Sequence, residues 1–114
     1  MKKTINIDLY KKKRLEKRYE EIVAIVNDDS YKFIIEDMTT ILNNRYFSRE
    51  NKDYKFRIDF IKRESSIYLK ENNQLFDIEL EDYKLEKKGK NTQLEYKISS
   101  DEEPFKIIIT EKED

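Results

Sequence analysis

Apolar and polar residues alternate with a period of two along most of this chain. In 54–61, Tyr, Phe and Ile occupy every second position from Tyr54 to Phe60, with Lys, Arg and Asp between them. Such alternation places the apolar side chains on one face of an extended strand and does not fit an amphipathic helix. Similar short runs recur at 5–9, 20–26, 31–35, 38–42, 67–69, 76–80, 94–98 and 105–109. The pattern predicts eight or nine strands, with Tyr83 and Leu85 continuing the phase of 76–80.

Short polar segments between these runs predict turns. Residues 27–30 are Asn, Asp, Asp and Ser, and Gly89 in 88–91 can take a positive φ without steric cost. The polar stretch 43–53 is predicted to be the longest loop. Strands joined by short turns are antiparallel neighbours, and closing an eight-stranded meander removes its exposed edges. The sequence therefore predicts an all-β fold, an antiparallel meander closing into an eight-stranded barrel.

Closure of such a barrel pairs the first strand with the last. This pairing would bring the basic end of the N-terminal strand toward the acidic residues Glu111, Glu113 and Asp114. Exposed ion pairs of this kind contribute about 0–1 kcal/mol each, so they are expected to add little to stability.

Residues 11–26 also fit a helix. Leu15, Tyr19, Ile22, Val23 and Val26 are spaced three and four apart, with charged residues on the other faces. The β-branched residues at the apolar end of this segment favour a strand instead. An α+β fold with an N-terminal helix around residues 11–26 is therefore the alternative.

The composition indicates one folded domain spanning 1–114. Charged residues make up 43% of the chain, but 8 Tyr and 6 Phe are far more aromatics than disordered segments carry. The absence of Cys favours a reducing compartment, and no apolar run has the length of a signal peptide or membrane span. We expect a cytoplasmic protein without a membrane partner, either a monomer or a homodimer.

The order of segments resembles one known family. The C-terminal part, 72–110, has a strand, a short connection, a strand ending in a Gly turn, a strand containing Leu-Glu-Tyr and a final apolar strand. The opening 5–10 and the pair of strands in 23–35 are also similar in layout to the YwiB-type family of small bacterial proteins of unknown function. The resemblance implies a calycin-like (lipocalin-like) barrel and a bacterial origin, and it assigns no functional residue.

Catalytic machinery is largely excluded by what the chain lacks. There is no His, no Cys and one Gly, which removes Ser/His/Asp triads, thiol chemistry, the usual zinc ligands and phosphate-binding loops. Glu79 and Glu81 would lie on one strand face, but they alternate with apolar residues and are predicted to face solvent. We expect a non-enzymatic protein with no metal and no cofactor.

The aromatic residues suggest where a ligand would bind. Most of them would point into the barrel, whose interior can be filled by side chains or can hold one small apolar molecule. Tyrosines prefer the barrel mouth, because each hydroxyl needs a polar partner. The candidate ligand-binding residues are Tyr31, Tyr54, Phe56 and Tyr96, and the predicted function is binding of a small, partly apolar ligand in the interior.

A basic run gives the alternative function. Lys11, Lys12, Lys13 and Arg14 begin a cationic segment that extends to residue 18 and would form a solvated loop after the first strand. Such a segment could contact a protein or a nucleic acid as an interaction module. The 24 basic and 25 acidic residues nearly cancel, which argues against nucleic acid as the partner.

Overall fold

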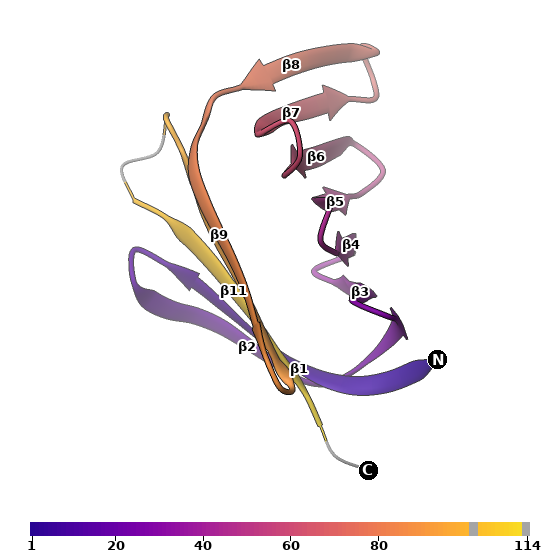
Figure 1. Cartoon of the computed structure of the whole chain (residues 1–114). Helices are drawn as coiled ribbons and strands as arrows, with labels where there is room; N and C mark the ends of the chain where they lie inside the picture. The colour runs from indigo at the N-terminus through magenta and orange to yellow at the C-terminus, as the bar shows by residue number, and fades with distance from the viewer. Residues whose placement is uncertain (101–102, 113–114) are drawn as a thin grey trace.

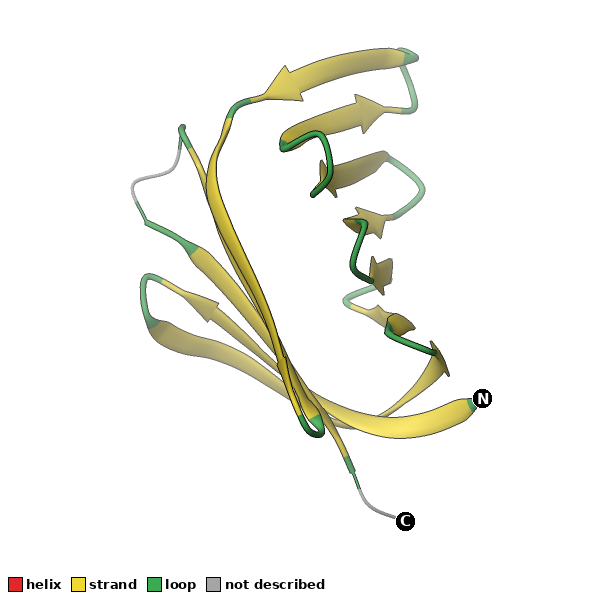
Figure 2. Ribbon diagram, in the orientation of Figure 1, coloured by secondary structure: helices red, strands yellow, loops and turns green. Residues whose placement is uncertain are grey.

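The computed structural model describes residues 1–100 and 103–112, and this part of the chain forms one antiparallel β-sheet without helices (Figure 2). Eleven strands are arranged around a common apolar core (Figure 1). Their bounds are β1 Lys2–Lys11, β2 Arg14–Asn27, β3 Ser30–Ile35, β4 Met38–Leu42, β5 Tyr46–Glu50, β6 Tyr54–Asp59, β7 Glu64–Leu69, β8 Gln74–Ile78, β9 Leu80–Lys88, β10 Asn91–Ile98 and β11 Phe105–Glu111. The all-β prediction is confirmed, and the predicted count of eight strands is wrong.

The strands follow one another around the sheet in the order β8-β7-β6-β5-β4-β3-β2-β1-β11-β10-β9. The predicted pairing of first and last strands is confirmed, since β1 lies antiparallel to β11 with Ile7 opposite Ile109. Lys3 Nζ lies 2.8 Å from Glu111 Oε1 across this pair. Glu113 and Asp114, which were also expected here, lie outside the described residues. The sheet is an up-and-down meander that almost closes into a barrel.

The remaining gap in the barrel lies between β8 and β9, which are separated in sequence only by Glu79. β8 pairs with β7 and β9 pairs with β10, and the pairings show that β8 and β9 run in the same direction. They are therefore two halves of one long strand that bends between the sheet edges (Figure 1). When β8 and β9 are counted as one strand, the meander has ten strands. Because consecutive strands alternate in direction, the first and the last strand of an even number run in opposite directions, so β1 and β11 can pair antiparallel.

Side chains rather than a hydrogen-bonded ladder connect the two sides of this gap. The ring of Tyr83 on β9 stacks on Phe60, which follows β6, with ring centroids 4.7 Å apart. The Tyr83 hydroxyl donates to the Phe60 carbonyl oxygen at 3.1 Å. Arg63 lies over the Tyr83 ring, with its Cζ 4.9 Å from the ring centroid. We call these three residues the seam cluster.

The N-terminal helix alternative is wrong, because residues 14–27 form the long strand β2. Lys12 and Lys13, with φ of 57° and 61°, make a two-residue hairpin turn, so the predicted basic loop is a β-hairpin. The register shifts by one residue twice along the β1–β2 pair, once at Glu21, whose φ is 57°. Each bulge adds a residue to β2. The bulge at Glu21 places Tyr19 and Ile22, three residues apart, on the same inner face opposite Ile7 and Ile5. Leu15 and Val23, which complete the helix-like spacing in the sequence, lie on the outer face and are exposed.

The predicted long loop at 43–53 contains strand β5. Asn43 Oδ1 accepts hydrogen bonds from the backbone N–H groups of Arg45 and Tyr46, and Asn51 Oδ1 does the same for Asp53 and Tyr54. Each Asn side chain thus forms a tight turn at one end of a five-residue strand. The polar residues of this stretch mark two turns rather than one loop.

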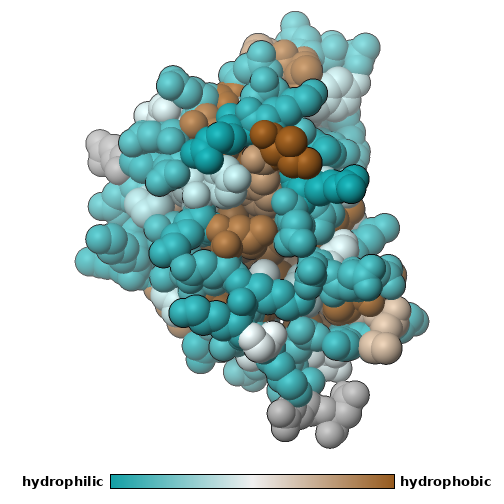
Figure 3. Space-filling model, viewed as in Figure 1, coloured by the Kyte–Doolittle hydropathy of each residue, from teal (hydrophilic) through white to brown (hydrophobic). Residues whose placement is uncertain are grey.

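The core lies inside the curved sheet and includes the alternating residues of most strands, such as Ile5, Ile7, Ile58, Leu94 and Ile109, each fully buried. Phe76 is an exception to the predicted pattern, with 49% of its surface exposed. It lies on β8, at the edge of the sheet, where no further strand covers it. In the space-filling view most of the surface is hydrophilic, and apolar side chains show near the gap beside β9 (Figure 3).

Candidate functional site

A row of cross-strand neighbours on the inner face of the sheet leads to the candidate site. Phe33 on β3, Thr40 on β4, Arg49 on β5, Phe56 on β6 and Ile67 on β7 lie directly opposite one another in successive pairs. Directly paired residues place their side chains on the same face of a sheet. Arg49 therefore brings a charged group into an otherwise mostly apolar interior row.

Arg49 lies between two cavities at the end of the barrel that carries the β3–β4 turn. The charged lobe has a volume of about 180 Å³, and its walls include Lys11, Lys17, Glu36, Phe47 and Lys106. The apolar lobe has a volume of about 240 Å³, and its walls include Met38, Tyr54, Phe56, Ile67 and Ile98. Both lobes share Arg49, Tyr96 and Phe105. We call the two lobes together the end cleft.

Aromatic rings form the inner wall of the end cleft. The Tyr96 ring lies 5.8 Å from that of Phe47, 5.9 Å from that of Phe56 and 5.6 Å from that of Phe105, measured between centroids. These separations are those of interacting aromatic pairs. Since β5, β6, β10 and β11 each supply one ring, the wall exists only when both sides of the sheet have come together.

A short chain of charges crosses the charged lobe. One terminal guanidinium nitrogen of Arg49 lies 3.2 Å from Glu36 Oε1, and Lys17 Nζ lies 3.4 Å from Glu36 Oε2. Burial opposes ionisation of Glu36, but hydrogen bonds and attraction from Arg49 and Lys17 outweigh it and hold the pKa of this carboxyl below its ordinary value. Glu36 is therefore a carboxylate at neutral pH.

Two buried polar atoms near these three charged residues lack hydrogen bonds to any described residue. They are Arg49 Nε and Thr40 Oγ1. Both belong to one cross-strand pair of the inner row. A buried donor without a partner costs about 1–3 kcal/mol, so native proteins seldom retain one without a use for it. Arg49, which lines both lobes, thus has hydrogen-bonding capacity that the described side chains do not satisfy, whereas Thr40 lines neither lobe.

Three of the four predicted ligand-binding residues, Tyr54, Phe56 and Tyr96, line the apolar lobe. The Tyr54 hydroxyl lies 3.9 Å from the sulfur of Met38. Tyr31 is elsewhere, fully buried near the opposite end of the barrel. It does not form a rim with the other three.

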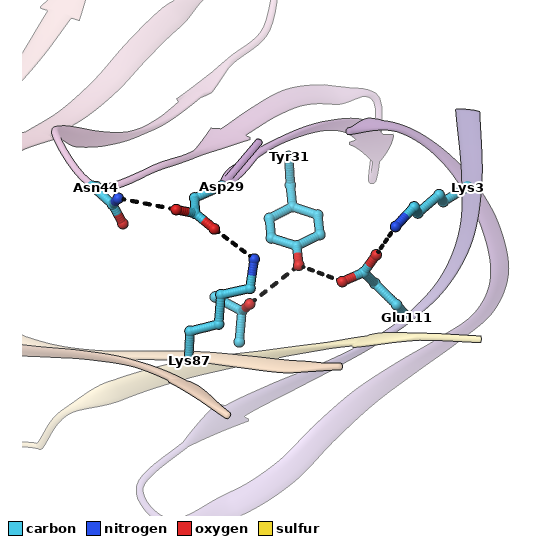
Figure 4. Close-up of polar contacts among 7 residues, drawn as sticks. Lys3, Asp29, Tyr31, Asn44, Lys87 and Glu111 are labelled. Atoms are coloured by element: carbon cyan, nitrogen blue, oxygen red, sulfur yellow. Dashed lines mark hydrogen bonds and ion pairs between the residues drawn. The ribbon is translucent and has the colours of Figure 1, made fainter. Parts of the chain in front are cut away.

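Tyr31 belongs to a polar network that fills that opposite end (Figure 4). Its hydroxyl donates to Glu111 Oε2 at 2.9 Å and accepts from Thr92 Oγ1 at 3.3 Å. The Lys87 ammonium lies 5.6 Å from the centre of the Tyr31 ring and 2.7 Å from Asp29. Burial of the ring raises the pKa of Tyr31, which keeps its hydroxyl protonated as a donor. This end of the barrel is filled, whereas the end cleft is hollow.

Glu111 gives this network a pH dependence that can be measured. The hydrogen bond from Lys3 lowers the pKa of Glu111 against the opposing effect of burial, and Tyr31 adds to the lowering. A carboxyl whose pKa is lower in the folded state stabilises the fold at neutral pH, and this stabilisation is lost as the pH falls through the folded-state pKa. Glu111→Gln should cost about 1 kcal/mol at pH 7. The difference from the wild type, measured by urea unfolding, should shrink below about pH 4; a constant difference would contradict this assignment.

The predicted partner-binding residues form the tip of the β1–β2 hairpin. Lys12 and Lys13 are exposed in the turn, and Lys11 and Arg14 face each other across it. The Lys11 ammonium lies 5.4 Å from the centre of the Phe105 ring, at the wall of the charged lobe. Further along the run, Arg18 is paired with Asp8 at 2.7 Å and Lys17 with Glu36. Part of the basic run therefore serves the end cleft and its surroundings.

Sequence reasoning did not find Arg49, Glu36 and Thr40. The polar composition of 43–53 predicts a loop at Arg49. Glu36 belongs to a two-residue turn with φ of 55° and 59° at residues 36 and 37, which no Gly or Asn signals. The spacing of Asn43 and Asn51 was an available signal, since two turn-forming Asn residues eight positions apart flank a strand of five. That reading would have placed Phe47 and Arg49 on one strand face.

Within the described residues no cluster of His, Cys, Asp and Glu is arranged to hold a metal ion. No helix in that part of the chain could cross a membrane. Comparisons with models of protein families, with curated proteins and with solved structures gave no match.

Proposed function

We propose that this protein is a non-enzymatic cytoplasmic binding module that takes a small, partly apolar molecule into the end cleft. The observation that supports the proposal is the aromatic wall of Tyr96, Phe47, Phe56 and Phe105 around two cavities that meet at Arg49. Apolar cavities with a few convergent polar groups are typical of small-molecule sites. The calycin-like resemblance remains part of this proposal, as an expectation about ancestry.

The volumes of the lobes limit the size of the ligand. Each lobe, at about 180 and 240 Å³, is smaller than the 300–1,000 Å³ that is typical of pockets for drug-sized ligands. A molecule of one or two fused rings, or a short alkyl chain, matches this space. Larger lipids would require the aromatic wall to open.

A neutral probe tests the proposal without involving the charges. 1-Naphthaleneacetamide, titrated into ¹⁵N-labelled protein, should give saturable shift changes at Arg49, Tyr96 and Phe105 and none at Tyr31 and Thr92. These two sets of residues lie at opposite ends of the barrel. Shifts that fail to saturate, or that are confined to the exposed strand β8, would overturn the proposal.

A pair of matched variants locates the binding. Tyr54→Ala removes a ring that lines the apolar lobe and should weaken probe binding about two- to tenfold, the usual value of one aromatic contact. Tyr46→Ala removes a ring that does not line either lobe and lies 4.1 Å from the Arg57 guanidinium. The Tyr46 variant should bind the probe like the wild type, and equal losses in both variants would argue against the end cleft.

A further inference from the structure

We propose that the ligand of the end cleft carries a carboxylate, which takes the place of Glu36 on Arg49. This inference rests on the proposed function and adds the chemical class of the ligand. It starts from Arg49, whose side chain lies on the inner face of the sheet and is only 20% exposed. One guanidinium nitrogen contacts Glu36, while the buried Nε has no partner among the described residues.

The geometry around Arg49 would allow the carboxylate of a ligand to make more hydrogen bonds to the guanidinium than Glu36 makes. A carboxylate binds a guanidinium most strongly through two parallel hydrogen bonds, one to each of two adjacent nitrogens. Glu36 uses one carboxylate oxygen to accept a hydrogen bond from Arg49, and its other oxygen accepts from Lys17. Because Nε is buried, a carboxylate arriving along the shared wall of the two lobes would bond it as well once the guanidinium turns this edge toward the cavity. It would satisfy the donor that the folded chain leaves unused.

The charge of the lobe also favours an anion. The chain as a whole has a net charge of −1, yet the walls of the charged lobe carry Lys11, Lys17, Arg49 and Lys106 against Glu16 and Glu36. This local excess of positive charge is opposite in sign to the charge of the protein. A partly enclosed, low-dielectric site strengthens such attraction. The adjacent aromatic rings provide the surface for the apolar part of the same molecule.

Glu36 is placed so that it can leave Arg49. It lies in the exposed β3–β4 turn, and 33% of its side chain is accessible to solvent. When a ligand displaces it, its carboxylate can therefore be hydrated at little cost, and Lys17 remains as a partner. Glu36 thus acts as an internal competitor that neutralises Arg49 while the end cleft is empty.

A pair of isosteric probes tests the inference. 1-Naphthaleneacetate and 1-naphthaleneacetamide have nearly the same shape and differ in charge. The acetate should bind the wild type at least about tenfold more tightly than the amide, the value expected for a charged hydrogen bond. Arg49→Gln should remove this preference, so that the ratio of the two dissociation constants falls to about one. Arg49→Lys keeps the positive charge but removes the pair of adjacent nitrogens that can bind both carboxylate oxygens. This variant should retain an intermediate preference.

Two further variants separate displacement from general electrostatics. Glu36→Gln should increase the preference for the acetate over the amide several-fold, because the competing charge is gone. Arg18→Gln is the matched control for Arg49→Gln: it removes a guanidinium from the pair with Asp8, outside the end cleft, and should leave the acetate preference intact. If Arg49→Gln fails to fold, Glu36→Gln still decides between the two outcomes.

The possible failures are distinguishable. Equal binding of both probes to the wild type, retention of the preference in Arg49→Gln, or no gain in Glu36→Gln would overturn the carboxylate inference while leaving the proposed function standing. Failure of both probes to bind would overturn the proposed function itself.

Discussion

Phe47→Ala is expected to lower the free energy of unfolding by about 3–5 kcal/mol, the usual cost of removing a buried Phe ring. Phe47 is 2% exposed and its ring contacts those of Phe56 and Tyr96, on the opposite sides of the barrel interior. The cavity left by the ring would adjoin the end cleft. Because the end cleft is itself empty space, few neighbouring side chains could move in to fill the new cavity. The measurement is urea or guanidinium unfolding followed by circular dichroism.

Phe76→Ala is the matched control for this prediction. It removes the same side chain from another strand, but Phe76 is 49% exposed on the edge strand β8. Its loss should cost about 1 kcal/mol or less, in proportion to the smaller area buried. Equal costs for the two variants would mean that β8 is covered in solution.

Tyr83→Ala is expected to cost about 2–4 kcal/mol, because this one side chain supplies stacking, a hydrogen bond and a cation–π contact across the gap between β9 and the β6–β7 turn. The ladder does not connect β8 to β9, so no strand pairing reinforces the seam cluster across the gap. Tyr83→Phe should cost about 1 kcal/mol, since it removes only the hydrogen bond to Phe60.

Hydrogen exchange distinguishes a local opening from a general loss of stability in the Tyr83 variants. In Tyr83→Ala the amides of β6–β8 should lose protection more than those of β1, β2 and β11, which are paired on both sides and lie away from the gap. A uniform loss of protection would show that the seam cluster contributes only to global stability.

Alternation of apolar residues predicted the fold class, most of the strands and the pairing of the first strand with the last. It could not predict the number of strands where local geometry interrupts the period. The bulge at Glu21 lengthens the spacing of inward residues on β2 from two to three, and the bend at Glu79 divides one predicted strand between two sheet edges. Such features depend on partner strands that are distant in sequence.

The candidate site was predictable only in its aromatic part. Tyr54, Phe56 and Tyr96 follow the period of two, so their inward direction could be predicted from neighbours in sequence. Arg49 could not be identified, because its position inside the barrel depends on pairing with Thr40 and Phe56, and its partner Glu36 comes from another turn. A charged residue in a strand of alternating pattern is normally expected on the outer face.

The position of the β1–β11 pair affects how the chain can fold. The register joins Ile5 to Glu111, so a contact between two inner strands of the sheet is among the most distant in sequence. During synthesis β1–β8 can pair successively as hairpins, whereas β9–β11 can join them only after residue 111 has emerged. Closing so long a loop carries an entropic cost and slows folding. The aromatic wall of the end cleft needs rings from both groups of strands, so the binding site should be completed in the last step of folding.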